Sequence, residues 1–216
     1  MSIQPDMSTP ADLPVMESFY TLQGEGRFQG KAAYFIRLGG CDVGCVWCDV
    51  KDSWDAEKHP HLSVDEIVEN LQKELSEVKK RDSSPFVVIT GGEPLMHNLD
   101  NLTQAIKEAG YRTHLETSGA HPLTGTWDWI CLSPKKFKAP LPDICKEANE
   151  LKVVIYHPSD FQWAESYADT VHSDCELYLQ PEWEKADKMT PLIVEYIQKN
   201  PKWTLCLQIH KYINVP

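Results

Sequence analysis

The sequence lacks any apolar run long enough to cross a bilayer. None of its hydrophobic stretches approaches the roughly 20 residues that a membrane-spanning helix needs. Residues 1–14 also lack a basic start followed by an apolar segment, so we expect no secretory signal and a cytoplasmic location. Basic residues are few as well, with 21 Lys and Arg against 32 Asp and Glu and a net charge of -11. We therefore expect neither nucleic acid nor membrane as a partner.

A disulfide framework is a second missing feature. The chain has seven cysteines, an odd number, and no export signal is expected. Four cysteines stand alone and are predicted to be small buried side chains: Cys131, Cys145, Cys175 and Cys206. The other three form one cluster with C-x3-C-x2-C spacing, directly after the apolar run of residues 32–38.

The clustered cysteines are Cys41, Cys45 and Cys48, and their spacing allows three kinds of site. A zinc site needs a fourth ligand, which His59 or His61 could supply. A redox dithiol needs only Cys45 and Cys48 and leaves Cys41 without a role. An iron–sulfur cluster on three thiolates leaves one iron open to a further ligand. The spacing favours the iron–sulfur cluster over zinc.

Strands and helices alternate along the rest of the chain, which indicates an α/β fold. Its length suits one domain over residues 15–216, after a flexible tail at residues 1–14. Strands are predicted at residues 32–38, 86–89, 111–115, 127–132, 151–156, 176–179 and 203–208, with a short or extended segment at 15–20. Helices are predicted from 64 to near 80, over 99–109 and 191–199, and within 159–168.

Polar or glycine-rich segments follow one predicted strand after another. In parallel sheets the carboxyl ends of the strands meet at one edge, where sites are built. Roughly seven strands are too few for a complete eight-unit barrel, so we predict an open, incomplete (βα)-barrel. A doubly wound open sheet is the alternative.

Two motifs carry a resemblance to a known superfamily. The cysteine motif, with Trp47 before its last cysteine, is similar to the signature of the radical S-adenosylmethionine (SAM) superfamily. Residues 90–94, with the sequence Thr-Gly-Gly-Glu-Pro, resemble that superfamily's second motif, whose backbone meets the methionine amino group. Further segments resemble the 7-carboxy-7-deazaguanine synthase family over nearly the whole chain from Glu17 on: residues 21–26, 35–38, 116–119, 133–135, 179–181 and 208–212.

The resemblance implies a modified, incomplete barrel of the radical SAM type and a specific reaction. A [4Fe-4S] cluster cleaves SAM, and the resulting 5′-deoxyadenosyl radical attacks C6 of 6-carboxy-5,6,7,8-tetrahydropterin. Ring contraction and loss of ammonia give 7-carboxy-7-deazaguanine, on the route to queuosine. The resemblance also implies a homodimer, a magnesium ion and a one-electron reductant such as flavodoxin. The rival readings are an activating enzyme for a glycyl-radical partner and a zinc-binding module without turnover.

Site residues follow from the resemblance, position by position. Cys41, Cys45 and Cys48 are expected to ligate three irons, and the fourth iron to bind SAM. The expected SAM contacts are Trp47, Cys48, Asp49, Gly92, Ser133, Pro134, Lys135, Gln180, Pro181, Glu182 and Trp183. The expected pterin contacts are Leu22, Gln23, Gly24, Arg37, Thr90, Glu116, His210 and the C-terminal Pro216.

For two of these residues, the chemistry of the side chain is a further reason to expect a contact with the pterin. The planar guanidinium fork of Arg37 suits the carboxylate of the pterin. The carboxylate of Glu116 offers paired acceptors to the amino and ring N–H groups.

One position departs from the family pattern. The family usually has Thr directly after the Cys-Asp pair, and the Thr hydroxyl reaches the magnesium ion. Here the residue is Val50, which has no side-chain oxygen, and magnesium prefers oxygen ligands. Either Asp49 or Ser53 compensates, or substrate, water and cofactor hold the ion alone, or the requirement is weak. We therefore expect a weaker magnesium dependence than in relatives with Thr.

Overall fold

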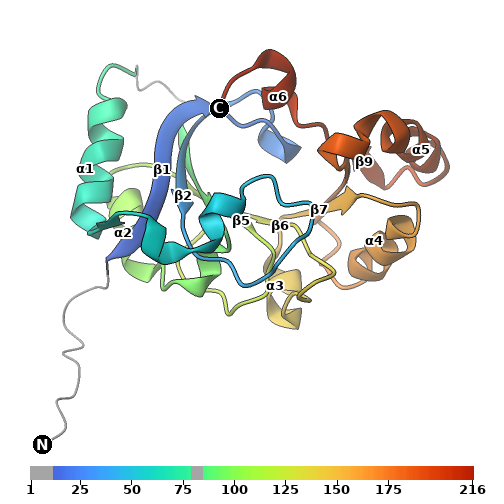
Figure 1. The fold of residues 1–216 in the computed structure, drawn as a ribbon, viewed down its shortest axis with the longest axis horizontal. Helices are drawn as coiled ribbons and strands as arrows, with labels where there is room; N and C mark the ends of the chain where they lie inside the picture. Colours follow the sequence, from blue (N-terminus) through green and yellow to red (C-terminus); the bar gives the residue numbers. More distant parts are fainter. Residues whose placement is uncertain (1–11, 79–84) are drawn as a thin grey trace, which may run out of the picture.

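The protein folds around one open sheet of nine strands, here taken from a computed structural model that describes residues 12–78 and 85–216 (Figure 1). The strand order is β3-β1-β2-β4-β5-β6-β7-β8-β9. The strands are β1 (Leu13–Leu22), β2 (Ala32–Leu38), β3 (His61–Leu62), β4 (Phe86–Gly91), β5 (Thr113–Thr117), β6 (Trp129–Leu132), β7 (Glu150–Ile155), β8 (Glu176–Pro181) and β9 (Trp203–Leu205).

The sheet is mixed, although the alternation of elements predicts a purely parallel one. From β2 to β9 each strand is parallel to its neighbours, whereas β1 is antiparallel to both β2 and β3. β3 and β9 are the two ends of the strand order and do not pair with each other. The sheet therefore forms an open, partial barrel, as predicted.

Helices cover the outer face of this sheet (Figure 1). The α-helices are α1 (Val64–Glu74), α2 (Asp100–Glu108), α3 (Pro142–Glu147), α4 (Asp160–Ala168), α5 (Ala186–Lys199) and α6 (Ile209–Ile213). Short 3-10 turns lie between them: η1 (Gly26–Phe28), η2 (Lys51–Trp54), η3 (Ala56–Lys58), η4 (Pro94–Met96) and η5 (Trp183–Lys185). Within the two described ranges, every helix is too short or too polar to span a membrane.

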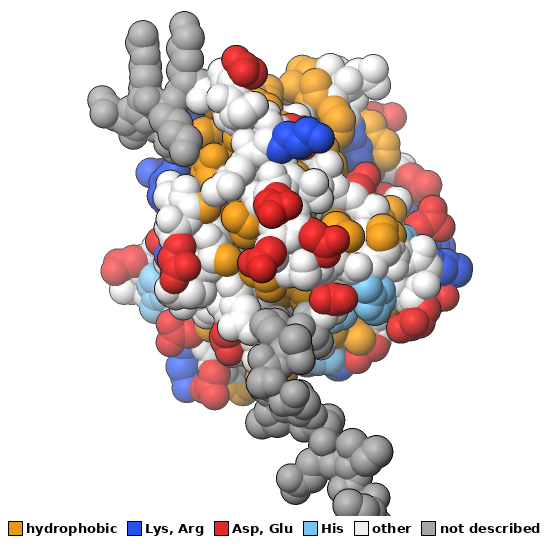
Figure 2. Space-filling view, turned by 90° about the vertical axis from the view of Figure 1, so that its left-hand side faces the viewer, with side chains coloured by type: hydrophobic (Ala, Val, Ile, Leu, Met, Phe, Trp, Pro, Cys, Tyr) orange, Lys and Arg blue, Asp and Glu red, His pale blue; other side chains and the backbone are white. Residues whose placement is uncertain are grey.

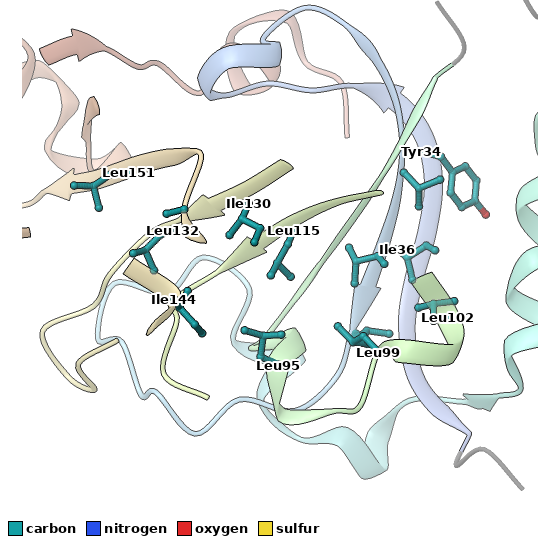
Figure 3. Packing of buried hydrophobic residues seen from close by; sticks show 14 of the residues in the cluster. Tyr34, Ile36, Leu95, Leu99, Leu102, Leu115, Ile130, Leu132, Ile144 and Leu151 are labelled. Atoms are coloured by element: carbon teal, nitrogen blue, oxygen red, sulfur yellow. The ribbon is translucent and has the colours of Figure 1, made fainter. Parts of the chain in front are cut away.

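The core lies between the helices and the outer face of the strands. Side chains alternate between the two faces of a strand, so every second residue points outward. Ile36, Leu115 and Leu151 from three of the strands are fully buried there, and they belong to one cluster with Leu102 of α2 and Ile144 of α3 (Figure 3). Burying a side chain of this size contributes about 1.5–3 kcal/mol, so this face holds the barrel in shape.

The inner face is aromatic at the amino ends of the strands. The ring of His114 stacks on Phe86 with centroids 4.1 Å apart, and Phe28 of η1 lies against both rings and against Trp129. Burial, with the nearby charge of Arg112, lowers the pKa of His114 to about 3, so the imidazole is neutral. This cluster of rings packs the inner face at the amino ends of β4, β5 and β6.

The ordered domain starts two residues earlier than predicted, at Leu13 and not at residue 15. The tail was predicted to include residues 13 and 14, yet Leu13 and Pro14 pair with Leu62 and His61 in the sheet. Leu13 is buried in the core, which explains why these residues are ordered into β1. Residues 1–11 of the predicted tail lie outside the described part of the chain.

The outer surface matches the acidic composition. Figure 2 shows a face on which acidic side chains predominate over Lys and Arg. Helix α1 lies at the left of Figure 1, and its residues Asp65 and Glu69 are exposed. No stripe of basic side chains that would suit a nucleic acid is visible on the described part of this face.

Candidate active site

One cavity of about 540 Å³ opens at the carboxyl ends of the parallel strands. Its floor is made by inward-pointing side chains of neighbouring strands: Arg37 of β2, Thr90 of β4, Glu116 of β5, Lys152 of β7 and Gln180 of β8. The loop of residues 41–54, after β2, forms a wall. The cavity thus lies at the sheet edge that the strand-end motifs predict.

The cysteine loop brings three thiols to this cavity. Cys41, Cys45 and Cys48 all line it and pack in one small group around Val43 and Ala120. Burial raises the pKa of Cys45 to about 11 and raises the pKa of Cys41 as well. Such thiols become thiolates when a metal ion supplies compensating positive charge.

The thiols share a loop and a cavity without forming a closed cage. Among the residues that the structure describes, no three His, Cys, Asp or Glu side chains converge into a metal site by themselves. The loop is nevertheless tightly anchored, because Cys41 donates its N–H to the carbonyl of Trp54 at 3.1 Å and Cys48 donates to that of Cys45 at 3.1 Å. Three soft thiolate donors on one loop are a ligand set that suits an iron–sulfur cluster.

The Gly-Gly turn after β4 packs directly against the cysteine loop. The N–H of Gly92 donates to the carbonyl of Leu38 at 3.0 Å, and the N–H of Glu93 donates to that of Gly40 at 2.8 Å. A Cβ atom on Gly92 would lie 2.3 Å from the Gly40 oxygen and 2.7 Å from the Cβ of Cys41. Only glycine permits this approach of two backbones, which explains why the turn carries glycine here.

Glu93 fastens the same turn to the end of β5. Its buried carboxylate accepts hydrogen bonds from the hydroxyl of Thr117 at 2.6 Å and the N–H of Ser118 at 2.8 Å. It also accepts one from the N–H of Leu95 at 3.1 Å. The glutamate of the motif therefore supports the turn, and it also forms part of the cavity lining.

Trp47 of the cysteine loop forms a basic and aromatic pair with Lys135, which follows β6. The ammonium group of Lys135 lies 5.5 Å from the ring centre of Trp47 and donates to the Ser133 carbonyl at 2.7 Å. Burial lowers the pKa of Lys135. A second cavity of about 220 Å³ adjoins Trp47 and is lined by Pro134 and Tyr156, among others. This region offers stacking surfaces and polar groups to a flat, polar ligand.

Arg37, Thr90 and Glu116 form a row across the cavity floor. Arg37 is beside Thr90 in the register of β2 and β4, and Ile89 is beside Leu115 in that of β4 and β5. Thr90 is therefore beside Glu116, and the row spans about 10 Å because strands are about 4.8 Å apart. One end of the row is a guanidinium and the other a carboxylate.

A buried ion-pair network adjoins this row and was not predicted from the sequence. Lys152 donates to Glu116 at 2.9 Å and also to Glu25, whose carboxylate accepts a further hydrogen bond from Gln208 at 2.8 Å. Burial alone would raise the pKa of Glu25, but the charge and hydrogen bond of Lys152 outweigh it and lower the pKa to about 2. Burial disfavours the charged form of Lys152, yet the surrounding acidic groups raise its pKa well above the usual value.

Comparison with known proteins agrees with this arrangement. Residues 35–137 match the model of the radical SAM superfamily. The chain is 53% identical to the 7-carboxy-7-deazaguanine synthase of Flavobacterium psychrophilum, over 94% of this chain and 93% of the relative. It is 50% identical to that of Synechocystis sp., again over 94% and 93%. A crystal structure of QueE from Escherichia coli matches with a TM-score of 0.76 at 30% identity, covering 91% of this chain and 93% of that chain.

This chain belongs to the 7-carboxy-7-deazaguanine synthase family. The predicted family, the predicted partial barrel and the prediction of a radical SAM enzyme are thereby confirmed. Membership in the superfamily supports a [4Fe-4S] cluster and SAM as cofactors. The three cavity-lining thiols fit that cluster, and the cavity beside them has room for a small molecule.

Most residues predicted for a 7-carboxy-7-deazaguanine synthase line the main cavity. Besides the three cysteines and the floor residues Arg37, Thr90, Glu116 and Gln180, these are Trp47, Asp49, Gly92, Ser133, Lys135, Glu182 and Trp183. Pro134 lines the second cavity, and Pro181 is buried at the end of β8, where it pairs with Ile155.

The remaining predicted residues do not line the cavity themselves, but they adjoin Glu25, Gln208 and Lys211, which do. The side-chain amide of Gln23 donates to Glu116 at 3.2 Å, and the carbonyl of Gly24 accepts from the N–H of Ile209 at 3.0 Å. A Cβ on Gly24 would lie 2.0 Å from Nδ1 of His210, so the glycine makes room for that imidazole. Leu22 ends β1, and the hydroxyl of Thr21 donates to the carbonyl of Pro216 at 3.4 Å, which places the C-terminus beside β1 (Figure 1).

The zinc alternative finds no support in the positions of the two histidines. His59 makes a 2.9 Å hydrogen bond to the carbonyl of Asp52, and His61 is an exposed residue of β3. Neither side chain lines the cavity of the three cysteines. A fourth protein ligand from these residues is therefore not in place.

Proposed function

We propose that this protein converts 6-carboxy-5,6,7,8-tetrahydropterin into 7-carboxy-7-deazaguanine, with loss of ammonia, as a step of queuosine biosynthesis. The observation that carries the proposal is the row of Arg37, Thr90 and Glu116 beside the cysteine loop. A carboxylated pterin has a negative group at one end and N–H donors at the other. A row of about 10 Å with a guanidinium at one end and a carboxylate at the other complements both.

On the cofactor side, Cys41, Cys45 and Cys48 would hold the cluster through three irons, and the fourth iron would be left for SAM. When bound, the cluster and SAM supply the radical that abstracts hydrogen from the substrate. The backbone of Gly92 meets the methionine amino group, and the nucleoside is held by Trp47, Asp49, Ser133, Pro134, Lys135, Gln180, Pro181, Glu182 and Trp183. Except for Pro181, these groups line the main cavity or the second cavity beside Trp47, which supports a binding site for an extended ligand next to the cysteine loop.

On the substrate side, Arg37 binds the pterin carboxylate and Glu116 accepts from the amino and ring N–H groups. Leu22, Gln23, Gly24 and Thr90 complete the pterin contacts. His210 and Pro216 close the lateral opening between β1 and β9. Support for this closure comes from the contact of His210 with Gly24 and from the hydrogen bond of Thr21 to Pro216.

The proposed reaction is tested by anaerobic turnover. The reconstituted protein is incubated with reductant, SAM and 6-carboxy-5,6,7,8-tetrahydropterin, and products are identified by mass spectrometry. We expect 7-carboxy-7-deazaguanine, ammonia and 5′-deoxyadenosine. A brown, reducible protein that cleaves SAM without forming a deazapurine would contradict the proposed substrate, and a colourless zinc protein would contradict the enzyme itself.

Removing the guanidinium of Arg37 should weaken substrate binding more than it slows chemistry. We expect Arg37→Leu to raise KM for the pterin about 10- to 100-fold, since a charge-assisted bidentate contact to the carboxylate is lost. Arg37→Lys should recover only part of this, because an ammonium group lacks the planar fork. The measurement is steady-state kinetics, reported as separate kcat and KM values.

The matched control is Glu17→Gln. Glu17 accepts from Nε of Arg37 at 2.6 Å, but its side chain is 45% exposed and does not line the cavity. We expect its KM to stay within about threefold of the parent value, as exposed ion pairs contribute little. An unchanged KM in Arg37→Leu would remove Arg37 from the site.

A magnesium ion is part of the proposal, with a weaker requirement than in relatives that carry Thr after the Cys-Asp pair. Val50 lines the cavity but has no side-chain oxygen. The hydroxyl of Ser53 donates to the Val50 carbonyl at 2.6 Å, and Asp49 accepts from Lys211 at 2.8 Å. Each side chain is thus already held by one hydrogen bond, and neither stands at position 50 itself.

Val50→Thr should create the missing ligand and strengthen the response to magnesium. Val and Thr have nearly the same shape, so the added hydroxyl is the main change. We expect turnover of the variant to rise several-fold with magnesium, and that of the parent and of Val50→Ala to change little. Turnover of the parent that collapses without magnesium, and returns at the same low ion concentration as in Val50→Thr, would refute this.

The setting of the enzyme completes the proposal. We propose a cytoplasmic homodimer that receives electrons from a one-electron donor such as flavodoxin. The homology to bacterial biosynthetic enzymes supports this location. Analytical ultracentrifugation tests the dimer, and turnover with purified flavodoxin and its reductase tests the donor.

A further inference from the structure

Lys152 is a buried cation that touches two carboxylates in the cavity floor. Its side chain is 4% exposed, although it stands in the middle of β7 between fully buried Leu151 and Val153. It points to the inner face, where its ammonium group donates to Glu116 of β5 and to Glu25 of the loop after β1. One ammonium group thus joins segments that are 36 and 127 residues away in the sequence.

The two carboxylates differ in how fully they are occupied. Glu25 also accepts from Gln208 at 2.8 Å and from Gln180 at 3.4 Å, so three donors share its roughly four acceptor positions. Glu116 accepts from Lys152 at 2.9 Å and from Gln23 at 3.2 Å, and it shares the weak thiol donor of Cys131 with Glu150, so between one and two positions stay open. Glu25 therefore has mainly a supporting position, and Glu116 has acceptor capacity left for a ligand.

The charges of this group do not balance. Lys152 contributes one positive charge, and Glu25 and Glu116 contribute two negative charges. Arg37, at the other end of the row, is already paired with Glu17. A ligand that brings N–H donors to Glu116 would compensate the remaining negative charge.

Stability alone does not account for such a group. A buried ion pair is often no more stabilising than apolar side chains of the same volume, because both charges lose their hydration. All three charged side chains also line the cavity and not the closed core. We therefore expect this buried network to position a hydrogen-bond acceptor for a ligand more than to support the fold.

We propose that Lys152 is a positioning residue that locks Glu116, with Glu25 behind it, as a rigid acceptor for the two adjacent N–H donors of a 2-amino-4-oxo pyrimidine ring. This inference rests on the proposed function and adds to it the feature of the substrate that is selected. An analogue with oxygen in place of the 2-amino group presents an acceptor to Glu116. The site rejects that analogue, because two acceptors face each other without a proton between them.

The test measures binding of two stable, fully oxidised ligands to the reconstituted enzyme with SAM present. These are 6-carboxypterin and 6-carboxylumazine, which differ in having an amino or an oxo group at position 2. Equilibrium dialysis gives Kd for each. We expect the parent protein to prefer the pterin by at least about 100-fold. In Lys152→Met we expect Kd for the pterin to rise at least about 10-fold and the preference to shrink to about 10-fold or less.

Two further variants separate positioning from folding. Lys152→Arg keeps the charge, and we expect it to recover part of the preference. Lys152→Met/Glu25→Gln keeps the net charge of the group, so it should regain the Tm lost by Lys152→Met without regaining the preference. Lys199→Met, which removes an exposed lysine of α5, is the matched control and should bind as the parent does.

Three results would overturn the inference. One is a parent-like preference in Lys152→Met, and another is a preference restored together with Tm in the double variant. A parent protein that binds both ligands equally would also refute it. Failure of the proposed function looks different, because the parent protein then forms no deazapurine from the reduced pterin. That result overturns both proposals.

Discussion

Replacing Cys45 with serine is expected to abolish cleavage of SAM. Cys45 is 8% exposed and lines the cavity with Cys41 and Cys48. A serine hydroxyl is a poor ligand for an iron–sulfur cluster, which is held by thiolates. The loop has one thiol for each of three irons of the cluster and leaves the fourth iron for SAM. No other cysteine of the loop could therefore replace Cys45 as a ligand. We expect iron and sulfide per chain to fall severalfold after anaerobic reconstitution, and 5′-deoxyadenosine formation to fall at least about 1000-fold.

The matched control for this prediction is Cys175→Ser. Cys175 is buried to a similar degree, 7% exposed, but lies just before β8 and does not line the cavity. Its replacement should lower stability without removing the cluster, as judged by iron content and by the electron paramagnetic resonance of the reduced protein. Cys45→Ser protein with a full iron content and parent-like SAM cleavage would remove Cys45 from the ligand set.

Elements with strong local patterns were predictable from the sequence. The apolar run of residues 32–38 coincides with β2. The capping box of Ser63 and Glu66 starts α1, and both of its hydrogen bonds are formed. Gly110 follows the end of α2 with φ of +87°, a conformation that glycine adopts easily. In each case the residues that decide the structure lie within a few positions of one another.

Elements whose limits depend on tertiary contacts were missed or shifted. Helix α5 begins at Ala186, although Pro191 suggests a start because proline is common in the first turn of a helix. Helix α6 was not predicted, and the strand predicted over 203–208 ends at Leu205. The contact of His210 with Gly24 holds α6 against the loop after β1. β3 has only two residues and exists through its pairing with β1.

The residues of the site fall into the same two groups, those set by local motifs and those set by tertiary contacts. Its cysteines and glycines stand in motifs with fixed spacing, so the sequence indicates them directly. Lys152 stands in an apolar strand, where a single lysine is usually solvent-exposed, and nothing near it in the sequence reveals Glu25 or Glu116. Only the curvature of the sheet brings the three together, with Gln208 added from the segment before α6. The cofactor site can therefore be recognised from short sequence motifs, whereas the substrate pocket depends on contacts between segments that are distant in the sequence.

Adding a single methyl group at Gly92 is expected to disable the enzyme almost as fully as removing a cysteine. The new Cβ would lie 2.3 Å from the Gly40 oxygen, where the N–H of Glu93 already donates at 2.8 Å. The Gly40 oxygen is a backbone atom, and Glu93 is held by Thr117 and Ser118, so the turn cannot move aside easily. In Gly92→Ala we expect the turn and the cysteine loop to separate, Kd for SAM to rise at least about 10-fold, and 5′-deoxyadenosine formation to fall about 100-fold or more.

Gly30→Ala separates this packing effect from backbone strain. Gly30 has φ of +80° but no atom within 4 Å of an added Cβ, whereas Gly92 is crowded without a left-handed φ. The Gly30 variant should lose about 1–2 kcal/mol of stability and keep SAM binding, while Gly92→Ala should lose SAM binding at a comparable Tm. Equilibrium dialysis with SAM and thermal unfolding give both quantities. Parent-like SAM affinity in Gly92→Ala would show that the turn does not have to contact the cysteine loop so closely.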